Sequence, residues 1–163
     1  MSTLFTKTDY DLLPEGFPAQ LVDGQLLREP SPTYGHQNVQ MRIVKRLLPL
    51  VDPDLLLVGP ADVLVDEHNV YQPDILVLRA APPRDAHDVG TPRVVFEVLS
   101  RSTVARDRDV KTPRLLALGV VEVWLVDPDA GTIACRTRAG TTRADGTTGH
   151  ASTAIAGFRI RPD

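Results

Sequence analysis

Residues 93–100 read RVVFEVLS, and this run is the clearest buried strand in the chain. The two residues on either side of Glu97 are all apolar, as expected of a strand covered on both faces of a sheet. A carboxylate in such a strand is costly to bury unless a cation or hydrogen-bond donors compensate it. Glu97 is therefore either a functional acid or one partner of a buried ion pair with a nearby arginine.

A second acid, Asp74, stands at the start of another predicted strand. It follows Gln72 and Pro73 and directly precedes the apolar run ILVL at 75–78. Two acids at or inside strands of one sheet can share a divalent ion. The alternative is that Asp74 only caps a turn after Pro73.

The bulk composition is that of one soluble globular domain, which we expect to span residues 1–163. The chain is 42% hydrophobic and 24% charged. Its single cysteine, Cys135, excludes an internal disulfide and a cysteine-based zinc cluster. No charged-then-apolar leader opens the sequence and no apolar run approaches the ~20 residues of a membrane helix. We therefore expect a cytoplasmic protein without membrane contact.

The net charge of −3 argues against tight, non-specific binding to a phosphate backbone. Locally, however, basic residues gather after the Glu97 strand: Arg101, Arg106, Arg108, Lys111 and Arg114. Asp107 and Asp109 interrupt them. The segment is either a solvated surface of mixed charge or a patch that faces phosphate.

Hydrophobic periodicity predicts the other elements. Asp23-Gly24 favours a tight hairpin turn between strands at 20–22 and 25–27. The apolar spacing over 34–51 predicts the clearest helix, which Pro49 ends. Further strands are expected at 55–58, 63–65, 73–79, 121–126, 132–137 and 155–160. Residues 138–151 are small, polar and without periodicity, and are expected to form a mobile loop.

A further helix is predicted to run from about Thr103 to Leu118, closed by Gly119. Pro113 conflicts with it, because a proline inside a helix costs about 3 kcal/mol or more. The conflict disappears if the regular helix starts near Asp109 or Thr112, since proline is tolerated in the first turn.

The absence of several known motifs narrows the catalytic mechanisms that the chain could use. The sequence has no glycine-rich phosphate loop, no nucleophile elbow and no zinc-protease motif. Aspartate, glutamate and lysine remain. A Pro-Asp pair followed by a strand that carries glutamate is the skeleton of a nuclease site, in which carboxylates hold Mg²⁺ at the scissile phosphate and a lysine stabilises charge or orients water.

These residues resemble the Uma-two family of restriction-endonuclease-like proteins, within the PD-(D/E)xK superfamily. The likeness is carried by QPD at 72–74, FEVLSRST at 96–103, Asp107, Lys111 and LGVVEVWLVDP at 118–128. Weaker sequence similarity to the family extends over nearly the whole chain. The resemblance implies an α/β (α+β) fold, with a restriction-endonuclease-like mixed β-sheet flanked by helices.

The resemblance also implies a site and a reaction. Asp74 and Glu97 would ligate Mg²⁺ (or Mn²⁺), and with Lys111 they would form the catalytic set of a metal-dependent nuclease that acts on nucleic acid, DNA above all. The superfamily usually places its lysine two residues after the second acid, where this chain has Leu99, so the role moves to Lys111. Three further residues would contact the metal ligands without binding the ion themselves: Gln20, His36 and Asp107. The alternative for His36, which the residues by themselves favour, is a capping or surface histidine.

Three departures from the family pattern keep other functions open. Gln20 stands where the family usually has glutamate, Leu115 where it has an aromatic residue, and Pro113 is atypical. One alternative is a catalytically weak or inactive member that binds nucleic acid or a protein partner. Another is a dimeric structural module with a vestigial pocket. We expect a homodimer.

Overall fold

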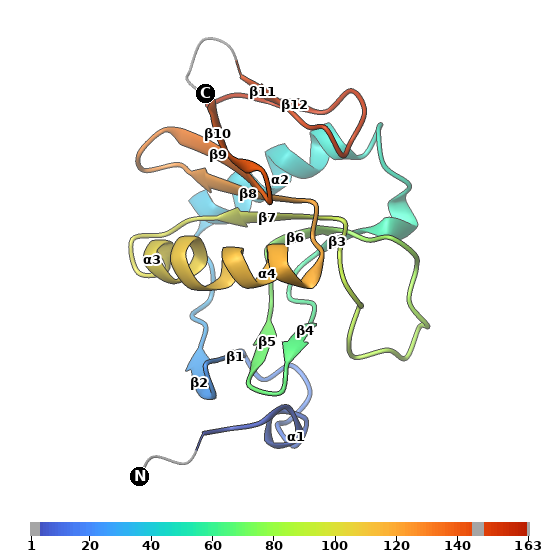
Figure 1. Ribbon diagram of the computed structural model, residues 1–163, viewed down its shortest axis with the longest axis vertical. Coiled ribbons are helices and arrows are strands. Elements are labelled where there is room, and N and C mark those ends of the chain that lie inside the picture. Colours follow the sequence, from blue (N-terminus) through green and yellow to red (C-terminus); the bar gives the residue numbers. More distant parts are fainter. Residues whose placement is uncertain (1–3, 145–148, 163) are drawn as a thin grey trace.

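A computed structural model describes residues 4–144 and 149–162 as an α+β fold, in which mixed sheets are flanked by a few helices (Figure 1). This is the fold class that the sequence predicts. The helices are α1 (Lys7–Tyr10), α2 (Tyr34–Leu47), α3 (Val104–Arg106) and α4 (Thr112–Leu118), with a 3₁₀ turn at Pro53–Leu55 and a π-helix at Asp107–Lys111.

The larger sheet has six strands in the described residues and is mixed. In spatial order they are β10 (Gly140–Ala144), β9 (Thr132–Thr137), β8 (Glu122–Asp127), β7 (Val94–Val98), β6 (Ile75–Val77) and β3 (Leu56–Val58). The central pair, β7 and β8, is parallel, and the other neighbours are antiparallel. A parallel pair requires a crossover, and the helical run 104–118 provides it.

A smaller sheet joins β2 (Gln25–Arg28), β1 (Ala19–Val22), β5 (Asn69–Tyr71) and β4 (Val63–Asp66) in that order. The hairpin between β1 and β2 turns at Asp23-Gly24, as predicted. Both residues have positive φ, at 52° and 68°, which is the conformation that a two-residue turn of this kind requires.

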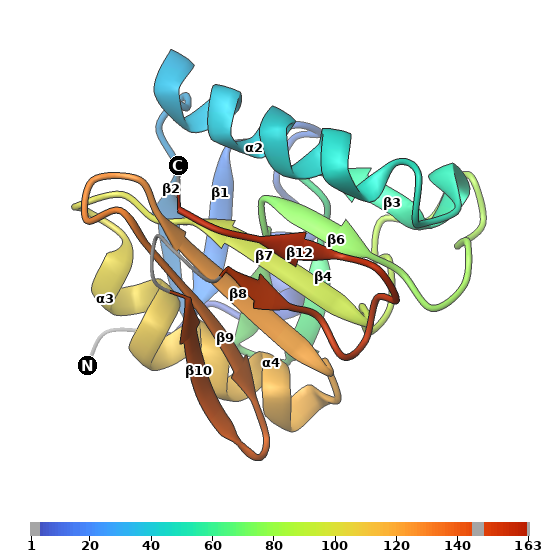
Figure 2. The ribbon, with the colours of Figure 1, turned by 90° about the horizontal axis from the view of Figure 1, so that it is seen from above.

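Strand β7 is buried on both faces because helices cover the two sides of the larger sheet (Figure 2). On one face Phe96 and Val98 belong to the core that α2 completes with Ile43 and Leu47. On the other face, Val95 and Leu99 pack in a second core with Leu115 and Leu116 of α4. Glu97 has the parity of this second set of residues, and its side chain contacts the helical run.

The helical run changes its hydrogen-bonding pattern at Asp107–Lys111, where it becomes a π-helix. The N–H of Thr112 bonds to the carbonyl oxygen of Asp107, five residues back. Pro113 follows in the first turn of α4, where its missing N–H does no harm. The start of the regular helix at Thr112 is one of the two positions that the sequence predicts, and the wider π turn lets the chain continue upstream without an α-helical bond from Pro113.

Glu122, at the start of β8, is another buried acid, with an exposed fraction of only 1%. Its carboxylate accepts hydrogen bonds from the Trp124 indole, from the Ser152 hydroxyl, from the Thr153 amide and hydroxyl, and from the Ala154 amide. These donors lower its pKa further than burial raises it. Glu122 therefore anchors residues 152–154 to the sheet.

Two expectations about the last part of the chain were wrong. The strand predicted at 155–160 shortens to β12 (Arg159–Ile160), which pairs with β11 (His150–Ala151) in a separate ribbon instead of closing the larger sheet. The loop predicted at 138–151 contains β10, and residues 145–148 of that loop lie outside the described residues. Threonine-rich strands pair well even without an apolar alternation. Within the described ranges, no helix combines the length and apolarity needed to cross a bilayer.

Candidate functional site

The site lies where β6 begins and β7 ends. Ile75 is opposite Phe96 in the antiparallel pairing of these strands. Asp74 directly precedes Ile75, so it lies at the same end of the sheet as Glu97, and its charge contributes to raising the pKa of Glu97. The order of the strands therefore brings the two predicted acids to one end of the sheet.

Asp74 is held by three donors from two elements. Its Oδ2 accepts a hydrogen bond of 2.7 Å from the backbone N–H of Val98. Its Oδ1 lies 3.0 Å from Nε2 of His36 and accepts a bond of 2.9 Å from the Gln40 amide. His36 and Gln40 are one turn apart on α2, and the hydrogen bond that His36 donates to Asp74 raises the pKa of His36 above its usual value despite the ring's partial burial.

Glu97 lies deeper and is paired with Lys111. The Nζ atom of Lys111 is 2.6 Å from Oε1 of Glu97 and 3.1 Å from Oδ1 of Asp107. Asp107 and Lys111 are four residues apart in the π-helix, so this segment presents both side chains to β7. The contact with Glu97 is a close ion pair, and Asp107 is a second carboxylate beside the same ammonium group.

Burial and the neighbouring charges shift the pKa values of both Glu97 and Lys111. Burial raises the pKa of Glu97, Lys111 lowers it, and the nearby carboxylates of Asp107 and Asp74 raise it further, with a net upward shift. Burial lowers the pKa of Lys111, but Glu97 and Asp107 outweigh burial and raise it. Lys111 therefore stays charged, whereas burial and the neighbouring carboxylates favour the protonated form of Glu97.

The exposed fractions of the side chains show which residues of the site are open to solvent. The side chains of Asp74 and His36 are each 20% exposed, whereas those of Glu97 and Lys111 are 5% and 2% exposed. A ligand would therefore meet Asp74 first and Glu97 behind it.

The other predicted support, Gln20, lies on the strand beside the loop that carries Asp74. Its Oε1 accepts a bond of 2.9 Å from the backbone N–H of Gln72, and its amide donates to Oε1 of Glu29 at 3.1 Å. Glu29 also pairs with Arg106 at 2.8 Å. Leu115, where the family has an aromatic residue, is fully buried in the core under α4.

The donor set can be compared with what a divalent metal needs. Among residues 4–144 and 149–162, no three His, Cys, Asp or Glu side chains form a ready metal cluster. Mg²⁺, however, is typically bound by one or two carboxylates, with waters and substrate phosphate filling its remaining positions. Asp74 and Glu97, at one end of the sheet, offer carboxylate oxygens of the kind that such an ion binds.

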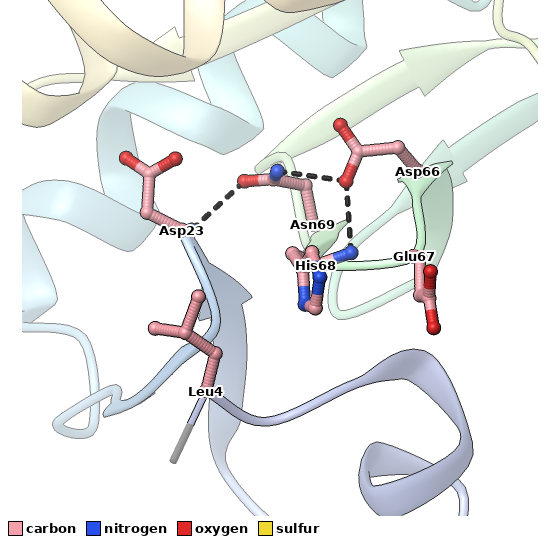
Figure 3. A pocket seen from close by; sticks show the side chains of 6 residues that line it. All are labelled: Leu4, Asp23, Asp66, Glu67, His68 and Asn69. Atoms are coloured by element: carbon pink, nitrogen blue, oxygen red, sulfur yellow. Dashed lines mark hydrogen bonds between the residues drawn. The ribbon is translucent and has the colours of Figure 1, made fainter. Parts of the chain in front are cut away.

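A surface hollow of about 410 Å³ lies elsewhere, at the outer end of the smaller sheet (Figure 3). Its lining residues are Leu4, Asp23, Asp66, Glu67, His68 and Asn69. Asn69 accepts a bond from the N–H of Asp23 and donates to Asp66, which fixes the turns against each other. Three acidic side chains would repel a phosphate backbone, so this hollow is a poor site for nucleic acid.

Sequence reasoning missed three side chains of this region. Gln40 could have been found from its spacing, because it follows His36 by one helical turn. Glu29 and Arg106 had no such signal, since their pairing joins elements far apart in the chain.

Comparisons with known proteins found a family and a similar fold. A sequence model of the Uma2 family, whose description is "Putative restriction endonuclease", matches residues 8–160. The crystal structure of a putative nuclease belonging to DUF820 from Anabaena variabilis ATCC 29413 superposes with a TM-score of 0.78, over 96% of this chain and 94% of that one. The two sequences are 19% identical, so this likeness supports the fold. No curated protein matches the chain.

Proposed function

The chain belongs to the Uma2 family of putative restriction endonucleases, and from that premise we propose that it is a metal-dependent nuclease that hydrolyses phosphodiester bonds of nucleic acid, with DNA as its substrate class. The observation that supports the proposal is that Asp74 directly precedes β6 and Glu97 lies on the neighbouring strand β7, with Lys111 in contact with Glu97.

Asp74 and Glu97 would hold Mg²⁺ or Mn²⁺. When bound, such an ion polarises a phosphoryl oxygen and makes a bound water more acidic. The N–H of Val98 and the side chains of His36 and Gln40 keep the Asp74 carboxylate in one orientation. Outer contacts of this kind orient ligands for a metal.

Lys111 would act as a fixed positive charge and a hydrogen-bond donor, because its raised pKa keeps it protonated. A protonated amine cannot take a proton from water, so Lys111 would stabilise the negative charge that develops on the phosphate. Asp107 holds the ammonium group beside Glu97.

A second candidate is a catalytically weak or inactive member that binds nucleic acid or a protein partner through the same scaffold. The observation that favours it is the near-complete burial of Glu97 and Lys111, which leaves only Asp74 and His36 partly open.

One experiment separates the two candidates. The purified chain is incubated with plasmid, single-stranded DNA and RNA, each with Mg²⁺ or Mn²⁺, beside Asp74→Ala and the remote control Asp11→Ala. Cleavage that Asp74→Ala abolishes and Asp11→Ala preserves supports the nuclease. Binding of DNA without cleavage, unchanged in Asp74→Ala, favours the binding module.

Three further properties stay predictions: a single domain over residues 1–163, a homodimer and a cytoplasmic location. Size-exclusion chromatography with light scattering would test the dimer directly.

A further inference from the structure

A chain of polar contacts links the loop before Asp74 to the helical run that carries Lys111. The backbone N–H of Gln72 donates to Gln20, whose amide donates to Oε1 of Glu29. The same oxygen of Glu29 accepts from Nη2 of Arg106 at 2.8 Å. Arg106 is the last residue of α3 and directly precedes Asp107. The contacts therefore connect the loop before Asp74 to the segment that carries Asp107 and Lys111.

The chemistry of each link is specific. Gln20 is 4% exposed, and it accepts from a backbone N–H with one atom while it donates to a carboxylate with the other. An amide can do both at once, whereas a carboxylate is only an acceptor. Glu29 and Arg106 are 24% and 22% exposed, so water screens their charges less than on an open surface.

The two ends of this chain of contacts are close in sequence to the site residues. Gln72 is two residues before Asp74, and Arg106 is one residue before Asp107, which contacts Lys111. A shift of either end would therefore change the separation between Asp74 and the Asp107–Lys111 segment.

We propose that the Glu29–Arg106 ion pair, acting through Gln20, is a positioning clamp that fixes Asp74 relative to the Asp107–Lys111 segment and thereby sets the affinity of the site for a divalent cation. This inference rests on the proposed function. Residues outside the coordination sphere commonly change metal affinity or activity by about 10–100-fold when they are mutated.

The test measures binding of MnCl₂ to the whole chain by isothermal titration calorimetry, together with kcat and the apparent metal constant in plasmid cleavage. The variant is Glu29→Ala. Its matched control is Asp23→Asn, which breaks another partly exposed ion pair, that of Asp23 with Arg114, also between the β1–β2 hairpin and the helical run. Glu29→Gln, which keeps an oxygen acceptor for both donors but removes the charge, serves as the conservative variant.

Glu29→Ala is expected to weaken Mn²⁺ binding about tenfold, to raise the apparent metal constant by the same factor and to retain kcat at saturating metal. Glu29→Gln is expected to weaken binding by a smaller, measurable factor, and it carries the test if Glu29→Ala does not fold. Asp23→Asn should bind Mn²⁺ as the wild type does.

Two results would overturn the clamp while the proposed function stands. One is a wild-type affinity in both Glu29 variants, and the other is an equal loss in Asp23→Asn. A wild-type chain that neither binds Mn²⁺ nor cleaves DNA would instead overturn the proposed function, and the clamp with it.

Discussion

The ammonium nitrogen of Lys111 lies 2.6 Å from Oε1 of Glu97, and both side chains are almost completely buried. Burying two charges costs several kcal/mol per ion, which a close pair repays only when the geometry is excellent. Further carboxylates lie near this pair, and they raise the pKa of Glu97. Such an arrangement is better explained by function than by stability.

The first prediction concerns the free energy of unfolding without metal. Glu97→Gln should stay within about 1 kcal/mol of the wild type, because Lys111 keeps Asp107 as a partner. Lys111→Met should cost about 3–5 kcal/mol, because it leaves two buried carboxylates without their shared cation. Urea unfolding with EDTA present measures both. A larger loss in Glu97→Gln than in Lys111→Met would show that Glu97 is a structural residue.

The second prediction is that divalent metal stabilises the chain. At a concentration of Mn²⁺ 100-fold above the dissociation constant, binding adds about 2.7 kcal/mol. For a domain of this size, that corresponds to a rise of roughly 5–10 °C in melting temperature. Asp74→Ala should lose the rise, whereas Asp11→Ala should retain it. If millimolar Mg²⁺ and Mn²⁺ leave the melting temperature of the wild type unchanged, this result would count against the metal site.

The third prediction concerns Gln40, which donates to Asp74. Gln40→Ala should weaken Mn²⁺ binding by about tenfold or more, because Asp74 loses one of the donors that orient it. Gln37→Ala is the matched control, since Gln37 is exposed on the same helix. The same titration calorimetry measures both. Equal affinities in the two variants would remove Gln40 from the site.

The fourth prediction concerns pH and Glu122. Its pKa is lowered below the usual 4.5, so the charged form contributes stability above that pH and loses it as pH falls through the folded-state value. Glu122→Gln should cost about 3 kcal/mol at pH 7, because donors lose their charged acceptor. The difference between wild type and variant should narrow below about pH 4.5. Urea unfolding from pH 3 to 7 measures it, and a constant difference would contradict the assignment.

Much of the fold could be predicted because its signals are local. The apolar neighbours of Glu97 gave a strand buried on both faces, and Asp23-Gly24 gave a hairpin turn. Pro113 located the start of α4 because a missing N–H restricts where a helix can contain it. The strand expected at 155–160 failed because its apolar residues pack into the core from turns, as Phe158 does against Trp124 and Phe96.

The site could be predicted only in part. The sequence pointed to Asp74, Glu97 and Lys111 through their strands and the family resemblance, and their roles as metal ligands and catalytic lysine stay predictions. The partners of these residues depend on tertiary contacts. Lys111 took the place that reasoning from Glu97 alone had given to an arginine, and the Glu29–Arg106 pair joins residues that no local pattern connects.

The anchoring of residues 152–154 by Glu122 also affects when the larger sheet can form during synthesis of the chain. Strand β8 leaves the ribosome before the donors that satisfy its first carboxylate, since Thr153 follows Glu122 by 31 residues. Until then, the Trp124 indole is the one donor of this set close to Glu122 in sequence, so pairing of β8 with β7 would bury a carboxylate whose other donors are missing. We therefore expect the larger sheet to close late, after these donors have emerged, so that a nascent chain stalled before residue 152 would remain open to proteases.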